Sequence, residues 1–296
     1  MLSTLSFTKH NAPNHGLNTS GFVYFFSGRP VSVTVRSNVP TRSLHNAMRE
    51  LATSIFTLKM HNSQTVSLLY PEDDNLDILF PCLLSLGVSL RPISHSTLKF
   101  IGQPDGFGYD RRKLSGWLLE DFEKLLFLDT DTLILKDLHT LFDYGELAAV
   151  SYGYPTGSQR INLGMFVLEP NSHLFSKLLG QRGSNDQDVL MDFYKRKNSL
   201  VLLPYWYLYD QQTFSRLGEF PREKILGFHF KGMKPTMFGP WNGSHCVDLR
   251  DGKGVSGWRD KAQCDFTSGW VDKWHSFERK LILEHPECNF KDTHHQ

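Results

Sequence analysis

Two aspartates that directly follow a short apolar run constrain this chain more than any other feature of its sequence. Residues 125–128 read Leu-Leu-Phe-Leu and lead into Asp129 and Asp131, after which residues 133–135 are apolar again. Runs this short are typical of buried strands and are too short for a core helix. Two carboxylates at the end of a buried strand are costly unless an opposite charge compensates them. A divalent metal ion is the usual compensation, because hard cations take carboxylate oxygens, and phosphate oxygens would complete such a site.

The composition fits one large α/β domain or two small ones, with ample core. The chain has 296 residues, of which 40% are hydrophobic. Its formal net charge is +1, so no overall field attracts nucleic acid or an anionic membrane. No run of about 18 apolar residues is present, and we therefore predict no transmembrane helix.

The order of the predicted elements indicates a largely parallel sheet with helices on both faces. We predict further strands at residues 31–35, 66–70, 88–93, 148–152, 164–168 and 225–230. We predict helices at residues 47–58, 76–86, 114–122, 138–142, 186–195 and 271–283. The expected organisation is a loose polar arm over residues 1–28, a main domain over residues 29–240, and a Trp-rich extension over residues 241–296 that packs on it.

The cysteines and the N-terminus leave the compartment open. The chain has four cysteines, at Cys82, Cys246, Cys264 and Cys288. They form no C-x-x-C pair, so we expect no zinc site, and we favour free buried thiols over a disulfide. The first 20 residues are polar and contain no signal-peptide core, which favours the cytoplasm. The cysteines and two glycosylation sequons, at residues 18–20 and 242–244, favour the Golgi or secretory lumen if the N-terminus is incomplete.

Three further polar clusters follow the acidic pair along the chain. Asn162 opens a predicted strand, Asp186 starts a predicted helix, and His229 lies near the end of another strand. In an open α/β sheet, ligands bind beyond the carboxyl ends of the strands, so the acidic pair and His229 are expected at one edge. Lys234 lies five residues past His229 and would offer a cation to a leaving diphosphate.

Asp129, Asp131 and His229 would together form a metal site of two carboxylates and one imidazole. The remaining coordination positions would be open to phosphate and water. This ligand set suits Mn²⁺, and Mg²⁺ less well, because imidazole is a softer ligand than oxygen.

These residues resemble the glycogenin-like retaining glycosyltransferases, known as family 8, from about residue 31 to about residue 235. Residues 124–135 resemble the metal-binding Asp-x-Asp segment of that family, and residues 229–235 match its His-Phe-x-Gly-x-x-Lys-Pro motif. The resemblance implies a GT-A nucleotide-diphospho-sugar transferase fold, with a mostly parallel central sheet in a catalytic domain over residues 29–240. It also implies a UDP-sugar donor and a Mn²⁺ ion, with Mg²⁺ as the alternative.

The resemblance assigns roles to individual residues beyond the three metal ligands. Lys113 would touch the donor sugar or its phosphates, and Lys234 would bind the diphosphate. Asp186 and Gln187 match the Asp-Gln pair that contacts the transferred sugar, and with Lys234 they are the catalytic candidates. The remaining donor-binding residues that it implies are Asp129, Thr130, Asp131, Asn162, Gly164, Gly232 and Asn38.

Four positions depart from the family pattern. Thr236 stands where the family places a tryptophan after Lys-Pro, and Leu163 is bulkier than the usual middle residue of Asn-x-Gly. Asn38 lies in a segment that matches the base-binding region only loosely. Ser215 lies near the position of the self-glucosylated tyrosine of glycogenin, which counts against a glycogen primer.

The hypothesis is therefore transfer of a hexose or related sugar from a UDP donor to a glycan, lipid, polyol or protein acceptor. The same Asp-x-Asp also fits haloacid-dehalogenase-like phosphatases, in which Asp129 would attack phosphorus beside Mg²⁺. That motif normally opens its domain, whereas 128 residues precede it here. It also needs a downstream acidic pair after a glycine, and the close candidates, Asp186 and Asp188, are preceded by Ser184 instead. A non-catalytic relative that binds nucleotide sugars is the third alternative, and the oligomeric state stays open. The C-terminal tryptophans are interpreted as packing the last helix against the sheet: Trp241, Trp258, Trp270 and Trp274.

Overall fold

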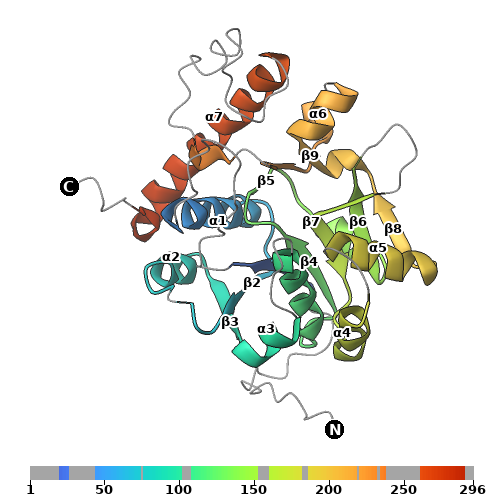
Figure 1. The fold of residues 1–296 in the computed structure, drawn as a ribbon. Coiled ribbons are helices and arrows are strands. Elements are labelled where there is room, and N and C mark those ends of the chain that lie inside the picture. Colours follow the sequence, from blue (N-terminus) through green and yellow to red (C-terminus); the bar gives the residue numbers. More distant parts are fainter. Residues whose placement is uncertain are drawn as a thin grey trace.

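A seven-stranded sheet runs through the centre of the computed structural model of this protein (Figure 1). The structure describes residues 20–26, 44–74, 76–101, 108–152, 160–181, 186–218, 220–231, 234–237 and 261–290. The strands lie in the order β3 (Val88–Ile93), β2 (Thr65–Pro71), β1 (Ser20–Phe25), β4 (Lys124–Leu128), β7 (Ile161–Leu168), β6 (Leu147–Ser151) and β8 (Leu200–Leu203). Only β7 runs antiparallel to its neighbours in this sheet, which confirms the predicted mostly parallel α/β architecture.

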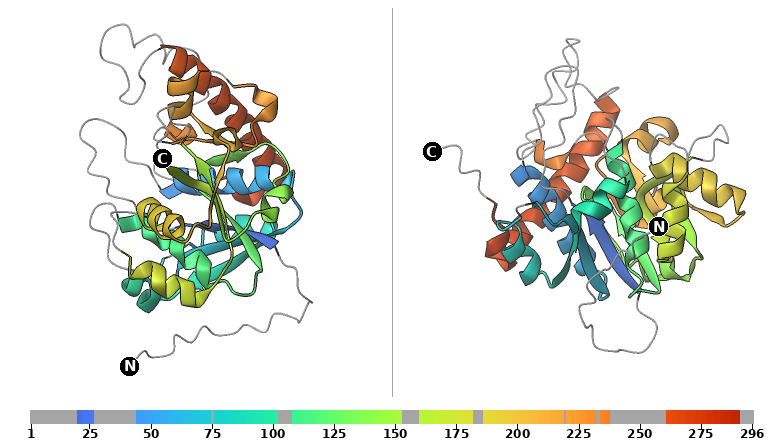
Figure 2. Two further views of the ribbon diagram at one scale, coloured as in Figure 1. Left: turned by 90° about the vertical axis from the view of Figure 1, so that its right-hand side faces the viewer. Right: turned by 60° about the horizontal axis from the view of Figure 1, so that its bottom comes forward.

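Helices cover both faces of this sheet, as predicted (Figure 2). Alternate residues of β1 point to opposite faces, so Phe22 and Tyr24 join one core cluster and Val23 joins the other. The first cluster is formed with α1 (Leu44–Lys59), α2 (Phe80–Ser85) and the 3₁₀-helix η2 (His139–Asp143). The second is formed with α3 (His95–Ile101), the 3₁₀-helix η1 (Gly108–Leu118), α4 (Ser172–Leu179) and α5 (Asp186–Arg196).

A smaller sheet of three strands adjoins the large one. Its order is β5 (Thr132–Ile134), β10 (Gly227–His229) and β9 (Leu208–Asp210). Strand β10 pairs antiparallel with β5 and parallel with β9. Because β5 follows β4 after only three residues, residues 129–131 lie where the two sheets meet.

The last long helix, α7 (Lys261–Glu284), packs against this smaller sheet. Trp270 and Trp274 are almost fully buried there, in a cluster with Phe228 and Phe266. The packing interpretation is therefore confirmed for these two tryptophans, whereas Trp241 and Trp258 lie outside the described residues. The helix begins ten residues before its predicted start. The remaining short elements are η3 (Tyr205–Tyr207), α6 (Gln211–Leu217), η4 (Arg222–Lys224), η5 (Pro235–Met237) and η8 (Pro286–Cys288).

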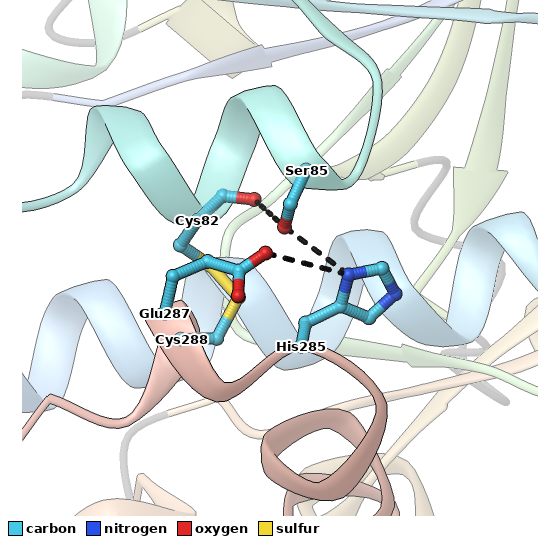
Figure 3. Close-up of a disulfide and its surroundings, with 5 residues drawn as sticks. All are labelled: Cys82, Ser85, His285, Glu287 and Cys288. Carbon is cyan, nitrogen blue, oxygen red and sulfur yellow. Dashed lines mark hydrogen bonds and ion pairs between the residues drawn. A yellow bond between two sulfur atoms is a disulfide. The ribbon is translucent and has the colours of Figure 1, made fainter.

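A disulfide joins Cys82 of α2 to Cys288 of η8 (Figure 3). The expectation of free thiols is therefore wrong for these two cysteines, which lie 206 residues apart in the sequence. Sequence spacing cannot reveal such a pair, because only the packing of α2 against the C-terminal segment brings the two side chains together. In the same place His285 Nδ1 lies 3.1 Å from Ser85 Oγ.

The N-terminal boundary of the domain was also predicted wrongly. Residues 20–25 were expected in a loose arm, yet they form β1, which has β2 on one side and β4 on the other. The apolar run at residues 22–26 drives this, since Phe22, Val23 and Tyr24 are fully buried, but the polar residues before it concealed the signal. The strand predicted at residues 31–35 lies outside the described residues.

Two predicted α-helices are also corrected. The helix predicted at residues 76–86 is confined to α2, because residues 77–79 form a turn before it. The segment predicted as a helix over residues 114–122 is the 3₁₀-helix η1, which ends at Leu118. No helix among the described residues has the length and apolar character needed to span a membrane.

Candidate active site

The turn between β4 and β5 places both aspartates at the junction of the two sheets. The Asp129 amide donates to the carbonyl of Gly164 at 3.0 Å, and the Phe230 amide donates to the carbonyl of Asp131 at 3.0 Å. Thr132 Oγ1 closes the turn by donating to the carbonyl of Asp129 at 2.8 Å. The backbone of the turn is therefore held by β7 on one side and by the end of β10 on the other.

His229 reaches the aspartates because β10 pairs with β5 in a register that sets His229 opposite Thr132. His229 Nε2 lies 3.6 Å from Asp129 Oδ2 and 3.4 Å from Asp131 Oδ1. One ligand atom from each of the three residues lies within 4.8 Å of the other two. Asp131 and His229 are buried and Asp129 is partly exposed, so the cluster opens on one side. Two converging carboxylates and one imidazole fit Mn²⁺, and Mg²⁺ less well.

The charge state of His229 depends on these carboxylates. Burial by itself would lower the pKa of His229, because it disfavours the charged imidazole. The negative charges of Asp131 and Asp129 and the hydrogen bond to Asp131 outweigh burial, so the pKa is raised above its ordinary value. A metal ion that binds Nε2 would therefore have to displace a proton.

Gly164 and Asn162 lie behind the histidine. A Cβ atom on Gly164 would come within 2.6 Å of His229 Nδ1 and 2.8 Å of Leu208 Cδ2, so only glycine leaves room for the imidazole ring. Asn162 Oδ1 accepts from the Gly164 amide at 2.9 Å, and its Nδ2 donates to Asp210 Oδ2 at 3.4 Å. The Asn-x-Gly segment therefore supports the ring of His229, while its role in donor binding stays a prediction.

Both predicted lysines pair with the aspartates. Lys113 Nζ lies 2.6 Å from Asp129 Oδ1 and 3.8 Å from Asp186 Oδ2, and it donates to the carbonyl of Leu163 at 3.2 Å. Lys234 Nζ pairs with the carboxylate of Asp131 and also donates to the carbonyl of Phe230 at 3.1 Å. Both ammonium groups are thus held at the acidic cluster, and their roles toward a donor stay predictions.

A third lysine and a tyrosine also lie near the site, and the sequence patterns did not identify them. Lys231 Nζ lies 4.0 Å from the ring centre of Tyr152, and Gln187 Nε2 donates to Tyr152 Oη at 3.4 Å. Burial lowers the pKa of Lys231 to about 8, although the negative charge of Asp129 opposes this. The position of Lys231 two residues after His229, inside the motif, was the signal that could have identified it.

The structure brings together nine of the predicted site residues: Lys113, Asp129, Asp131, Asn162, Gly164, Asp186, Gln187, His229 and Lys234. Asp186 is buried at the start of α5 and accepts from the Gln187 amide at 2.8 Å. Thr130 lies between the two aspartates in the turn. Asn38 and Gly232 lie outside the described residues, so their predicted roles stay predictions.

No known protein-family model matches the chain. Individual proteins do match it. The chain is 27% identical over 190 residues to a putative UDP-glucuronate:xylan alpha-glucuronosyltransferase 5 of Arabidopsis thaliana, covering 59% of this chain and 31% of that protein. It is 33% identical over 165 residues to human glycogenin-2, covering 50% of this chain and 32% of that protein. The chain thus spans about a third of the length of these relatives.

Solved glycosyltransferases share the fold. The galactosyltransferase LgtC, in complex with donor and acceptor sugar analogs, has a TM-score of 0.52 at 14% identity, over 88% of this chain and 96% of that one. The glycosyltransferase GlyE of Streptococcus pneumoniae has a TM-score of 0.54 at 17% identity, over 90% of this chain and 64% of that one.

The protein has the GT-A glycosyltransferase fold, as predicted. That fold argues against the phosphatase alternative, which would need a haloacid-dehalogenase domain. Its sequence relatives are glycogenins and xylan glucuronosyltransferases, which confirms the predicted resemblance to the glycogenin-like glycosyltransferases of family 8.

Proposed function

We propose that this protein is a retaining glycosyltransferase that moves a hexose or related sugar from a UDP-sugar to a glycan or protein acceptor. The observation that carries the proposal is the convergence of Asp129, Asp131 and His229, with a lysine paired to each aspartate. When bound there, Mn²⁺ would act as a Lewis acid toward the diphosphate of the donor. The curated relatives, which include transferases named for a UDP-sugar donor, support the same reaction class.

The residues around the metal site would divide the work on the donor. Lys234 and Lys113 would stabilise the negative charge that develops on the departing UDP. Asp186 and Gln187, at the start of α5, would face the transferred sugar, and the Lys113–Asp186 contact at 3.8 Å links them to the acidic turn. The transition state would be oxocarbenium-like, as in other sugar transfers.

The donor sugar is best sought among hexoses and hexuronates. The relatives include glycogenins and proteins named for UDP-glucuronate. Lys231 is a reason to test the hexuronates, because its ammonium could pair with their carboxylate. That ammonium lies on the ring of Tyr152, which also contacts Gln187, a residue proposed to face the transferred sugar. If a hexuronate is the donor, Lys231→Met would lower turnover of UDP-glucuronate more than turnover of UDP-glucose.

The disulfide bears on the compartment. Disulfides persist in oxidising compartments and are rare in the cytosol. The Cys82–Cys288 bond therefore favours the secretory lumen as the working compartment.

Release of UDP from a panel of UDP-sugars, with Mn²⁺ or with EDTA, tests the proposal. We expect Mn²⁺-dependent release from one donor, lost in Asp129→Asn and retained in Asp143→Asn. Asp143 is the matched control because it is exposed at the end of η2. Hydrolysis of a phosphate monoester that requires Asp129, without UDP release, would favour the phosphatase. Calorimetric titration with Mn²⁺ and UDP completes the test, since a chain that binds neither contradicts the proposal.

A further inference from the structure

Helix α1 carries a buried polar face that the proposed chemistry does not use directly. Glu50, Thr53, Ser54 and Thr57 lie on one face because they are spaced by three or four residues, and each is 0% exposed. Buried helix faces are normally apolar, and buried polar groups normally have partners. Thr57 Oγ1 accepts from the amide of Ile134 in β5 at 3.2 Å, so this face lies against the strand that follows the acidic turn.

Ser54 belongs to a chain of hydroxyl groups that ends on the backbone of Asp129. Thr132 Oγ1 donates its single proton to the Asp129 carbonyl, so at 2.9 Å from Ser54 Oγ it must accept. Ser54 then donates to Thr132 and accepts from Tyr24 Oη, which lies 3.0 Å away. Burial raises the pKa of Tyr24, so its phenol keeps the proton that it donates. The hydrogen bonds of this hydroxyl series are therefore all donated in one direction, from Tyr24 in β1 through Ser54 in α1 to the acidic turn.

Glu50 contacts the other side of the site. Its Oε1 accepts a hydrogen bond from Oγ1 of Thr236, which lies two residues after Lys234. Thr236 stands where the family that the chain resembles has a tryptophan. The contact with Glu50 is therefore made by a residue that departs from the family pattern. Glu50 and Ser54 lie one helical turn apart on α1. One helix thus reaches both the turn with the aspartates and the segment with Lys234.

We propose that the buried polar face of α1 positions the two sides of the metal–diphosphate site relative to each other. Ser54 acts through Thr132 on the acidic turn, and Glu50 acts through Thr236 on the segment of Lys234. None of these side chains touches the reacting atoms, so they are positioning residues. The inference rests on the proposed function, because it assumes that Asp129 and Asp131 hold a metal ion.

Mn²⁺ affinity in the presence of UDP, measured from the electron paramagnetic resonance of free Mn²⁺, tests the role of Ser54. Loss of an outer-shell partner weakens metal binding by roughly 10- to 100-fold, and we expect about tenfold for Ser54→Ala. Ser67→Ala is the matched control, since Ser67 on β2 is also fully buried and its hydroxyl has no hydrogen-bond partner among the described residues. Equal affinities in the two variants would overturn the proposal.

A double variant separates positioning from stability. Ser54→Ala removes one of the two hydroxyl partners of the buried Tyr24 phenol, the other being Thr132, and we expect it to lower the melting temperature. Adding Tyr24→Phe removes that hydroxyl, so the double variant should recover melting temperature but not Mn²⁺ affinity. Recovery of both together would mean that Ser54 is merely structural. If the wild-type protein binds no Mn²⁺ with UDP, the proposed function fails, which is a different result from equal binding by wild type and Ser54→Ala.

Thr236 gives an independent test on the other side. Thr236→Val keeps the shape of the side chain but removes the hydrogen bond to Glu50. We expect the KM for the UDP-sugar to rise several-fold with kcat little changed, and Thr236→Ser to behave as wild type. If Thr236→Ser is as impaired as Thr236→Val, the hydroxyl is not what matters and the Glu50 contact has no positioning role.

Discussion

The acidic-cluster side of the candidate site and the side that supports it differ in how clearly the sequence marks their residues. Asp129 and Asp131 share one turn, and His229 joins them through strand pairing. The supporting contacts join Ser54 to Thr132, 78 residues apart, and Glu50 to Thr236, 186 residues apart. The chemical groups lie in short motifs, whereas the contacts that orient them depend on the whole fold.

Helix α1 connects this support to the C-terminus. Arg49 donates to both carboxylate oxygens of Glu278 in α7, at 2.5 and 3.0 Å, and its guanidinium lies 5.8 Å from the ring centre of Trp274. Burial would raise the pKa of Glu278, but the hydrogen bonds and charges of His275 and Arg49 lower it. These contacts hold helix α7 against α1, and α1 in turn contacts the candidate site. None of the contacts between α7 and α1 given above involves Asp129, Asp131 or His229.

The largest effect is expected from the loss of a proposed metal ligand. Asp131→Asn keeps the shape of the side chain but removes the charge that faces His229 and Lys234. We expect Mn²⁺ affinity, measured by calorimetry with UDP, to fall by more than the roughly 100-fold that loss of an outer-shell partner costs. Unchanged affinity would show that the ion binds elsewhere.

Loss of the disulfide should affect stability and leave the metal ligands intact. Cys82→Ser opens a crosslink between residues 206 apart and should lower the free energy of unfolding by about 2–4 kcal/mol. Chemical denaturation measures this, with Mn²⁺ affinity as the second readout. A reductant should destabilise the wild type but not the variant. Equal stability of the wild type and the variant without reductant would contradict the Cys82–Cys288 pairing.

Gly164 shares a property with each of the two sides. It belongs to a short sequence motif, like the acidic cluster, but it acts by packing against His229, like the supporting residues. Gly164→Ala would place a methyl group 2.6 Å from His229 Nδ1 and should cost about 1–3 kcal/mol of stability as well as weakening Mn²⁺ binding. Gly145→Ala is the matched control, since no described atom lies within 4 Å of the position of its added Cβ. Similar losses in both variants would refute the packing role.

The smallest expected effect is a pH dependence of opposite sign with and without metal. The raised pKa of His229 stabilises the metal-free fold fully below the unfolded pKa of about 6.5, and this contribution is lost as pH rises through the folded pKa. Over the same range Mn²⁺ affinity should rise, because the imidazole loses its proton. Melting temperatures between about pH 6 and 8, with and without Mn²⁺, test this, and His229→Gln should remove both slopes. Parallel slopes would exclude His229 as a ligand.

The convergence of Asp129, Asp131 and His229 could be predicted because each lies in a short pattern at the end of a strand. Asp129 and Asp131 follow an apolar run, and His229 ends β10. The sequence misplaced β1 because the polar residues before Phe22 outweighed the short apolar run when the segment was taken as a whole. It also missed the Cys82–Cys288 bond and the polar face of α1, because tertiary packing alone brings those partners together.

We propose that Asp129, Asp131 and His229 hold the metal ion that binds the donor diphosphate. A crystal structure with Mn²⁺ and UDP, analysed by anomalous diffraction at the manganese edge, tests it most directly. We expect one strong anomalous peak in contact with a carboxylate oxygen of each aspartate, with His229 Nε2 and with the diphosphate, and Lys234 on a phosphate oxygen. A peak elsewhere, or UDP bound without manganese at these three residues, would contradict it.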